Sequence, residues 1–304
     1  MSEEQATQPP PSILESLTTW VKTTDRAYLI GGGIAILGIF LAFWPLLRDL
    51  PAIWFGLGSW EFRNSDGYFS HGVLVPLISG YIIVRKWDDI KEFPVKPGWI
   101  GIGFLLVFLL GLRAAHLSDL HQLRSVFLIG TMVSLVWIVA GFRWMLALAP
   151  AILYLLFALP IWTGFIDNYT NPLQIHSTTV AYHLLNLGGY NVFKDGPTDL
   201  LLDTFQLSVA VPCSGLKLVV AVTAFTVFFV LIAKLKWWGN LLMIGSILPL
   251  CLFINGLRIA LIGVVGEEAG HSAGLQFHDY SGYLTLLVCF FILFKFAKVL
   301  GWKD

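Results

Sequence analysis

The chain has 304 residues, of which 57% are hydrophobic and 12% are charged, and its formal net charge is zero. Soluble domains contain roughly half apolar and a quarter charged residues, so this composition favours a protein that crosses a membrane several times. The balanced charge gives no overall field that would recruit nucleic acid, which excludes that class of partner. The cysteines, at positions 213, 251 and 289, are too few for a disulfide framework.

The first 26 residues are polar and are predicted to form a short cytoplasmic tail. They contain Pro9, Pro10 and Pro11 but no apolar run followed by a cleavage site of small residues, as a signal peptide would have. Residues 27–300 are predicted to form a single transmembrane domain. Residues 301–304 would be a cytoplasmic C-terminus.

Apolar segments recur along the chain at lengths that suit membrane spans, each of which needs roughly 20 apolar residues. The expected fold is therefore an all-α polytopic membrane protein with about eight transmembrane helices. Only Gly141-Phe142-Arg143 separates the fourth segment from the fifth, which predicts a very tight hairpin. The eight segments are approximately 27–47, 68–85, 97–113, 122–141, 143–163, 214–233, 238–266 and 280–300.

The basic residues predict the orientation of these spans. With the N-terminus inside, the inner connections hold more Lys and Arg than the outer ones, including Arg85, Lys86, Lys234 and Lys236. Cytoplasmic loops carry such an excess, so both termini are expected in the cytoplasm.

The connection between the fifth and sixth spans, about 164–212, would then be a structured loop at the outer face. An amphipathic helix is predicted over Asn171–Leu187, opened by Asn171-Pro172 and stopped by Gly188-Gly189. Residues 200–211 alternate with period two, which predicts a short hairpin or extended segment leading into Cys213.

Three chemically capable residues are expected at the outer face. Cys213 begins the sixth span at its outer end, and His278 lies two residues before the eighth. Arg258 comes 22 residues after Lys236, which at about 1.5 Å per helical residue is roughly 33 Å, or one bilayer core.

These residue types suit a cysteine nucleophile. A free thiol has a pKa near 8.5 and is mostly protonated at neutral pH, so it needs a base or a nearby cation. The His278 imidazole can exchange protons, whereas the Arg258 guanidinium can only stabilise negative charge. The predicted roles are nucleophile for Cys213, acid and base for His278, and electrostatic stabiliser for Arg258. Alternatively, Arg258 snorkels to the interface and His278 is an interfacial anchor.

Other polar residues could support this site. Asp279, Glu267 or Glu268 could orient the imidazole, or could be solvated loop charges. His71, Asn255 and Ser214 are further supporting candidates, although His71 and Asn255 could simply satisfy a neighbouring helix by hydrogen bonding. The sequence does not separate His71 from His278 as the proton-transfer group.

No metal or cofactor site is expected. His176 and His183 lie seven residues apart on the predicted outer helix, without a carboxylate or cysteine at ligand spacing, so they indicate a polar helix face. Cys251 and Cys289 fall within spans and are interpreted as packing residues.

At four motifs the chain resembles the exosortase/archaeosortase family of membrane cysteine transpeptidases. The motifs occur in the family's order from about residue 68 to 292, and each alone is weakly specific. They are Ser70-His71-Gly72 with Pro76 and Tyr81, Cys213-Ser214-Gly215-Leu216, Asn255-Gly256-Leu257-Arg258-Ile259, and Phe277-His278 followed by Gly282. Pro212 and Lys217 depart from the residues frequent in the family, which leaves the subfamily and its sorting signal open.

The resemblance implies a processing enzyme for exported proteins, in an exopolysaccharide-associated sorting system of the bacterial inner membrane. Its substrates would carry a C-terminal signal: a short motif such as Pro-Glu-Pro, one transmembrane helix and a basic cluster. The enzyme would cleave near the motif through a thioester on Cys213, with Arg258 and His278 completing the triad. It would then pass the new carboxyl end to an unknown acceptor, with no cofactor.

One alternative is a transporter or lipid-handling membrane protein in which Arg258 and His278 bind an anionic substrate. Gly and Pro residues that interrupt the spans, such as Pro76 and Pro249, are typical of such proteins. This alternative leaves Cys213 without a role. A further alternative is a purely structural scaffold for an export or polysaccharide machine.

Overall fold

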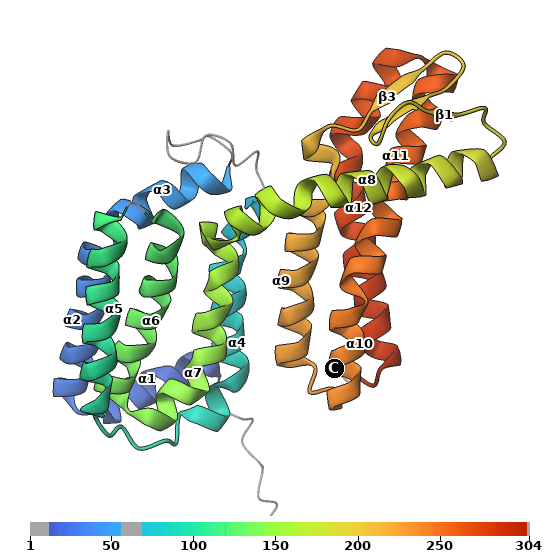
Figure 1. Cartoon of the computed structure of the whole chain (residues 1–304). Coiled ribbons are helices and arrows are strands. Elements are labelled where there is room, and N and C mark those ends of the chain that lie inside the picture. Colours follow the sequence, from blue (N-terminus) through green and yellow to red (C-terminus); the bar gives the residue numbers. More distant parts are fainter. Residues whose placement is uncertain (1–11, 56–68, 119, 303–304) are drawn as a thin grey trace, which may run out of the picture. The chain divides into compact units, whose positions relative to one another are not determined.

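The computed structural model describes residues 12–55, 69–118 and 120–302 (Figure 1). The chain divides into two compact units, described here one at a time. The N-terminal unit consists of Met1–Leu47 and Gly80–Leu153, and the C-terminal unit of Arg48–Ser79 and Tyr154–Asp304.

The N-terminal unit is helical throughout its regular structure. Helices α5 (Ile100–Leu117) and α6 (His121–Ala140) form a closely packed hairpin. Gly111 on α5 leaves room for the ring of Phe127, and Gly130 on α6 leaves room for the ring of Phe108. The predicted very short connection after α6 is confirmed, since Gly141 alone, at a φ of 100°, separates α6 from α7. The helices are α1 (Ile13–Thr23), α2 (Arg26–Ala42), α4 (Val75–Ile90, from Gly80), α5 (Ile100–Leu117), α6 (His121–Ala140) and α7 (Phe142–Tyr154).

The predicted tail contains α1, an amphipathic helix that begins with a capping box between Ser12 and Glu15. Trp20 on α1 packs against Trp87 and Trp144, with ring centroids 5.6 Å and 5.5 Å away. Two residues after α1, the chain bends by 110° into α2. The inward face of α1 is thus fixed by aromatic packing.

The C-terminal unit combines helices with a small sheet. Its helices are α3 (Trp44–Trp54, from Arg48), η2 (Ser70–Val73), η3 (Leu155–Ala158), η4 (Pro160–Trp162), α8 (Thr163–Leu187), η5 (Val211–Cys213), α9 (Leu216–Ile232), α10 (Trp237–Gly245), α11 (Ile247–Ala269) and α12 (His271–Val299). Strands β1 (Phe193–Lys194), β2 (Asp199–Leu201) and β3 (Gln206–Ser208) pair antiparallel in the order β1-β2-β3.

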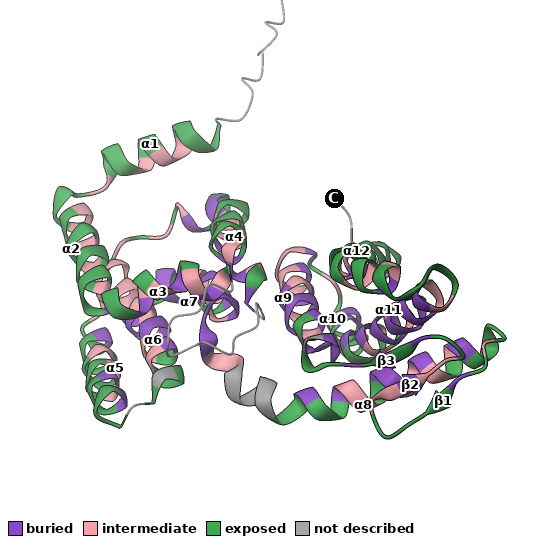
Figure 2. Cartoon of the chain, turned by 90° about the horizontal axis from the view of Figure 1, so that it is seen from above, coloured by how far each residue is buried: buried purple, intermediate pink, exposed green. Residues whose placement is uncertain are grey.

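Helix α8 crosses α11, with the sheet beside it (Figures 1 and 2). Its buried residue Ala181 shares a core with Ile259 of α11, and Gly256 of α11 leaves room for Val180. Leu200 lies opposite Leu207 in the sheet, and both are buried in that same core. Cys213 belongs to it as well, so the sheet and α8 together position the thiol.

Two predictions for the segment before Cys213 are confirmed: α8 ends at Leu187 with Gly188 as its cap, and an antiparallel hairpin follows. The predicted helix start at Asn171 is wrong, because α8 begins at Thr163 and contains Pro172. Thr170 and Leu173 beside the proline are buried. Their packing offsets the backbone hydrogen bond that a proline removes.

Within the described residues, four helices are long and apolar enough to cross a membrane: Ile100–Leu117, Gln122–Ala140, Trp237–Ala269 and His271–Val299. The bent pair of α1 and α2 would add one more, whereas Phe142–Ala158 and Leu216–Ile232 are shorter apolar helices. The first predicted span divides at Phe43 between α2 and α3. Eight spans therefore stay a prediction, as does the position of residues 164–212 at the outer face.

Candidate active site

Cys213 ends η5, at a sharp turn before α9. Gly215 provides the turn with a φ of 87°, a left-handed conformation that other residues rarely adopt. A Cβ atom at Gly215 would also lie 2.8 Å from Nδ2 of the buried Asn255. That Asn255 amide donates a hydrogen bond to the Cys213 carbonyl oxygen at 2.9 Å. Asn255 therefore supports the turn that carries the thiol.

Helix α8 holds the backbone on both sides of Cys213. The Gln174 side chain donates a hydrogen bond to the Val209 carbonyl, and the Ser177 hydroxyl donates to the Ser214 carbonyl at 3.3 Å. The buried Ser214 hydroxyl in turn accepts a hydrogen bond from the Leu216 amide at 3.3 Å, at the start of α9. The predicted residue Ser214 thus binds the first backbone amide of α9, beside the thiol.

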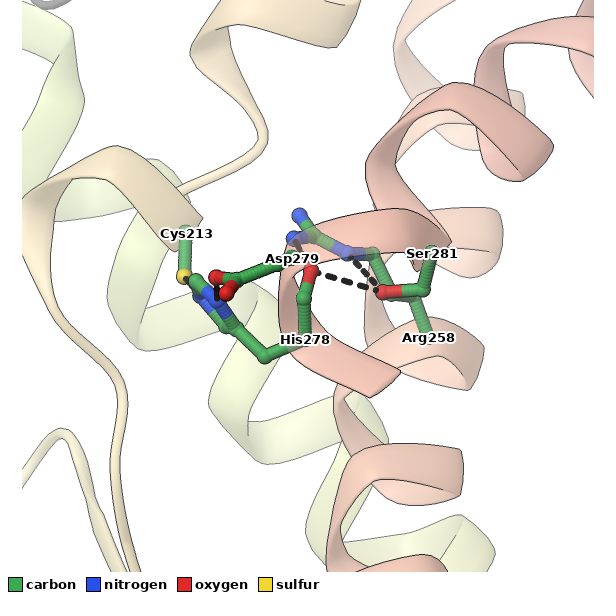
Figure 3. Close-up of polar contacts among 5 residues, drawn as sticks. All are labelled: Cys213, Arg258, His278, Asp279 and Ser281. Atoms are coloured by element: carbon green, nitrogen blue, oxygen red, sulfur yellow. Dashed lines mark hydrogen bonds and ion pairs between the residues drawn. The ribbon is translucent and has the colours of Figure 1, made fainter. Parts of the chain in front are cut away.

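The His278 imidazole joins Cys213 to Asp279 (Figure 3). Its Nε2 atom contacts the Cys213 sulfur, and its Nδ1 atom lies 3.2 Å from Oδ1 of Asp279. A carboxylate can only accept, so this contact favours the tautomer with the proton on Nδ1. Nε2 then has a free lone pair directed at the thiol, which is the geometry of a base poised to take its proton.

Arg258 is attached to the same turn of α12 through two hydrogen bonds. Its Nε atom donates to the Ser281 hydroxyl at 2.9 Å, and its Nη2 atom donates to the His278 carbonyl at 3.0 Å. The Ser281 hydroxyl donates to that same carbonyl at 3.1 Å. The guanidinium is therefore held in one orientation beside the backbone of His278 (Figure 3).

Burial and two nearby charges act on the pKa of the Cys213 thiol, and not all in the same direction. Cys213 is only 5% exposed, and this burial raises its pKa most strongly. The Arg258 charge lowers the pKa of Cys213, whereas the Asp279 charge raises it. The net pKa lies above the usual value. The resting thiol is thus protonated at neutral pH and depends on a base to become a nucleophile.

The structure brings Cys213, Arg258 and His278 together, but His278 lies inside a helix, whereas the sequence placed it two residues before the eighth span. Helix α12 begins at His271, two turns earlier, and Arg258 lies within α11, which continues to Ala269. Between the helices, Gly270 makes the turn with a φ of 88°. Residues 271–279 include polar side chains and so lack the continuous apolar run that marks a span in the sequence.

The acidic residues have separate partners. Asp279 contacts the imidazole, whereas Glu267 accepts from the Thr204 amide at 3.1 Å and Glu268 accepts from the Tyr190 hydroxyl at 3.2 Å. The two glutamates therefore attach the hairpin and the segment before it to the end of α11. Of the three orienting candidates, the geometry selects Asp279.

His71 lies on η2, in a different part of the C-terminal unit's chain. The Gly72 beside it leaves room for the Trp54 ring, whose Nε1 atom donates to the Ala158 carbonyl at 2.8 Å. The contact to the Cys213 sulfur is made by His278.

Sequence reasoning did not identify Ser281, Gln174 or Ser177. Ser281 could have been found, because it lies three residues after His278 and so on the same face of a helix. Gln174 and Ser177 could not have been found from the sequence, because they reach the backbone around Cys213 only through the packing of α8 in the folded protein.

Comparisons with known proteins identify the family. A family model described as transmembrane exosortase matches residues 60–295, a range that includes Cys213, Arg258 and His278. Searches of curated proteins and of solved structures each returned no match. Since the family match covers more than half of the chain, the protein belongs to the transmembrane exosortase family, whose members are multi-pass membrane proteins.

Proposed function

We propose that this exosortase-family protein is a membrane-embedded cysteine transpeptidase that cleaves a C-terminal sorting signal of exported proteins. The observation that carries the proposal is the contact of the Cys213 sulfur with His278 Nε2, with Asp279 at the other ring nitrogen. A thiol, a base and a group that orients the base are the parts that acyl transfer through a covalent intermediate requires.

The first half of the reaction forms a thioester. His278 Nε2 takes the thiol proton as the sulfur attacks the carbonyl carbon of the scissile peptide bond. Arg258 stabilises the negative charge on the resulting oxyanion. The carbon–nitrogen bond then breaks, and the proton on His278 passes to the leaving amine.

The second half transfers the acyl group. An acceptor amine or hydroxyl, or water, gives its proton to His278 and attacks the thioester carbonyl. The carbon–sulfur bond breaks, and the thiolate regains the proton from His278. The acceptor decides whether the outcome is transpeptidation or hydrolysis.

The site is proposed to lie at the outer, periplasmic face of a bacterial inner membrane, with both termini in the cytoplasm. The basic residues of the predicted inner connections support this orientation. Partners would be exported proteins with a motif, a single membrane helix and a basic cluster, together with an acceptor nucleophile. The transporter alternative is not favoured, because it leaves the contact between Cys213 and His278 without a purpose.

Intact mass spectrometry of the purified full chain, mixed with a synthetic peptide of the motif–helix–basic type, tests the proposal. We expect a hydroxylamine-labile adduct on the native chain and none on Cys213→Ala. Cys251→Ala is the matched control, because it removes another buried thiol, and it should form the adduct normally. Cleavage of the peptide at an unchanged rate by Cys213→Ala would refute the thioester mechanism.

A further inference from the structure

The N-terminal unit contains an apolar cavity of about 600 Å³ that the proposed chemistry does not use. Residues of helices α1, α2, α6 and α7 line it. Its lining includes Trp20 and Trp144 at one end and Ile39 and Met132 farther along α2 and α6. The volume falls in the range of about 300–1,000 Å³ that is typical of ligand sites.

The cavity is elongated along α2. The lining residues of that helix extend from Tyr28 to Ile39, which at about 1.5 Å per residue is roughly 16 Å. This length suits an extended acyl chain running along a helix. The cavity is partly open rather than enclosed, as a site filled from the surrounding bilayer would be.

The aromatic end of the cavity suggests where the membrane surface lies. Trp20 and Trp144 pack together there with Trp87, whose indole nitrogen donates to the Ser16 hydroxyl at 3.0 Å. Tryptophans gather at the level of lipid headgroups. Ile13, Leu14 and Val21 on the outward side of α1 are exposed, as in a helix that lies in the interface.

Basic residues lie beside the lining residues of this end in the sequence. Four exposed basic residues each lie within two positions of a lining residue: Lys22, Arg26, Lys96 and Arg143. The acidic residue equally near is Asp25, whose carboxylate accepts a hydrogen bond from the Ala27 amide at the start of α2. Basic residues thus outnumber acidic ones within two positions of the lining, although the chain as a whole is neutral.

We propose that this cavity binds an anionic phospholipid, with one acyl chain along α2 and the headgroup among the four basic residues. Near an anionic membrane surface each Lys or Arg strengthens binding by about fivefold. The apolar lining would accept the tail of any lipid, so the headgroup charge supplies the selectivity.

Two glycines on α2 offer a matched pair of variants. Gly33 lines the cavity and Gly31 does not, and a Cβ atom at either position would meet no atom within 4 Å. Leucine is a better helix former than glycine, so neither substitution should impair folding. Gly33→Leu would place its side chain where the acyl chain runs, whereas Gly31→Leu would not.

Native mass spectrometry of the full-length protein in detergent, titrated with phosphatidylglycerol and phosphatidylcholine of equal chain length, tests the proposal. We expect one preferred phosphatidylglycerol per chain, reduced by roughly fivefold or more in Gly33→Leu and unchanged in Gly31→Leu. Lys96→Gln with Arg143→Gln should reduce the preference for phosphatidylglycerol, whereas Lys236→Gln in the other unit should not.

Equal binding of the two lipids by the native chain would overturn the selectivity for anionic headgroups. Equal effects of Gly33→Leu and Gly31→Leu would overturn the location. Because the measurement does not involve Cys213 chemistry, its failure would leave the proposed function untouched, and the reverse also holds.

Discussion

At the scale of single residues, the reactivity of Cys213 depends on opposing charges. Burial holds its pKa above the usual value, so the fraction of thiolate at neutral pH is small. The Arg258 charge lowers that pKa and the Asp279 charge raises it. Asp279 thus has two effects, because it orients His278 but disfavours the thiolate that His278 helps to form.

This balance predicts the pH dependence of thiol alkylation. The rate at Cys213 should rise with pH, with a midpoint above that of a free cysteine. Arg258→Gln removes a positive charge that lowers the pKa of Cys213, so the midpoint should move to higher pH. Asp279→Asn removes a negative charge that raises this pKa, so the midpoint should move to lower pH. Iodoacetamide labelling followed by peptide mass spectrometry measures each midpoint. A shift in the same direction for both variants would contradict the assigned charges.

Substitution of Asp279 separates its two effects. Asp279→Asn should slow peptide acylation, by about tenfold, because the amide no longer favours the tautomer with its proton on Nδ1. The Asp279 side chain is 76% exposed, so we expect a smaller loss than a buried carboxylate would give. Single-turnover acylation rates provide the test. Faster alkylation together with slower acylation would be the signature of an orienting residue, and unchanged acylation would exclude that role.

At the scale of elements, the turn between η5 and α9 delivers the thiol. Gly215 there has a left-handed backbone and lies close to Asn255. Gly215→Ala therefore costs about 1–2 kcal/mol in backbone conformation, and its Cβ atom would also clash with Asn255. We expect it to lose stability and acylation together. Gly189→Ala is the control, because its φ is 84° and a Cβ atom there would meet nothing within 4 Å.

Thermal unfolding and acylation rates of the two variants decide the question. Gly189→Ala should lower stability alone, since it carries the backbone cost without the contact to Asn255. If both glycine variants acylate equally fast at temperatures where both are folded, the turn at Gly215 does not position the thiol.

At the scale of the whole molecule, the open question is how the helices cross the bilayer. The proposed orientation places the connection at Lys234 in the cytoplasm and the turn at Gly270 outside it. Each position is fused in turn to a reporter that is active only in the cytoplasm and to one that is active only outside it. Their activities show on which side of the membrane each position lies. Opposite locations are expected, and the same location for both would mean that α10 and α11 do not span the membrane.

Much of this protein follows from its sequence, because the relevant signals are local. Apolar runs predicted helices such as α5 and α6, Gly188-Gly189 the end of α8, and period-two alternation the hairpin before Cys213. Chemistry and helix length suggested that Cys213, Arg258 and His278 meet. Four motifs in order indicated the family that the comparison then established.

Tertiary structure decided what depends on contacts between distant segments. The start of α12 at His271 is not marked by apolar residues, and the continuation of α8 through Pro172 rests on the burial of its neighbours. Asp279 was distinguished from Glu267 and Glu268 only by the partners that each carboxylate contacts. Sequence patterns record the preferences of each segment for helix, strand or turn, whereas the pairing of side chains depends on how the segments pack.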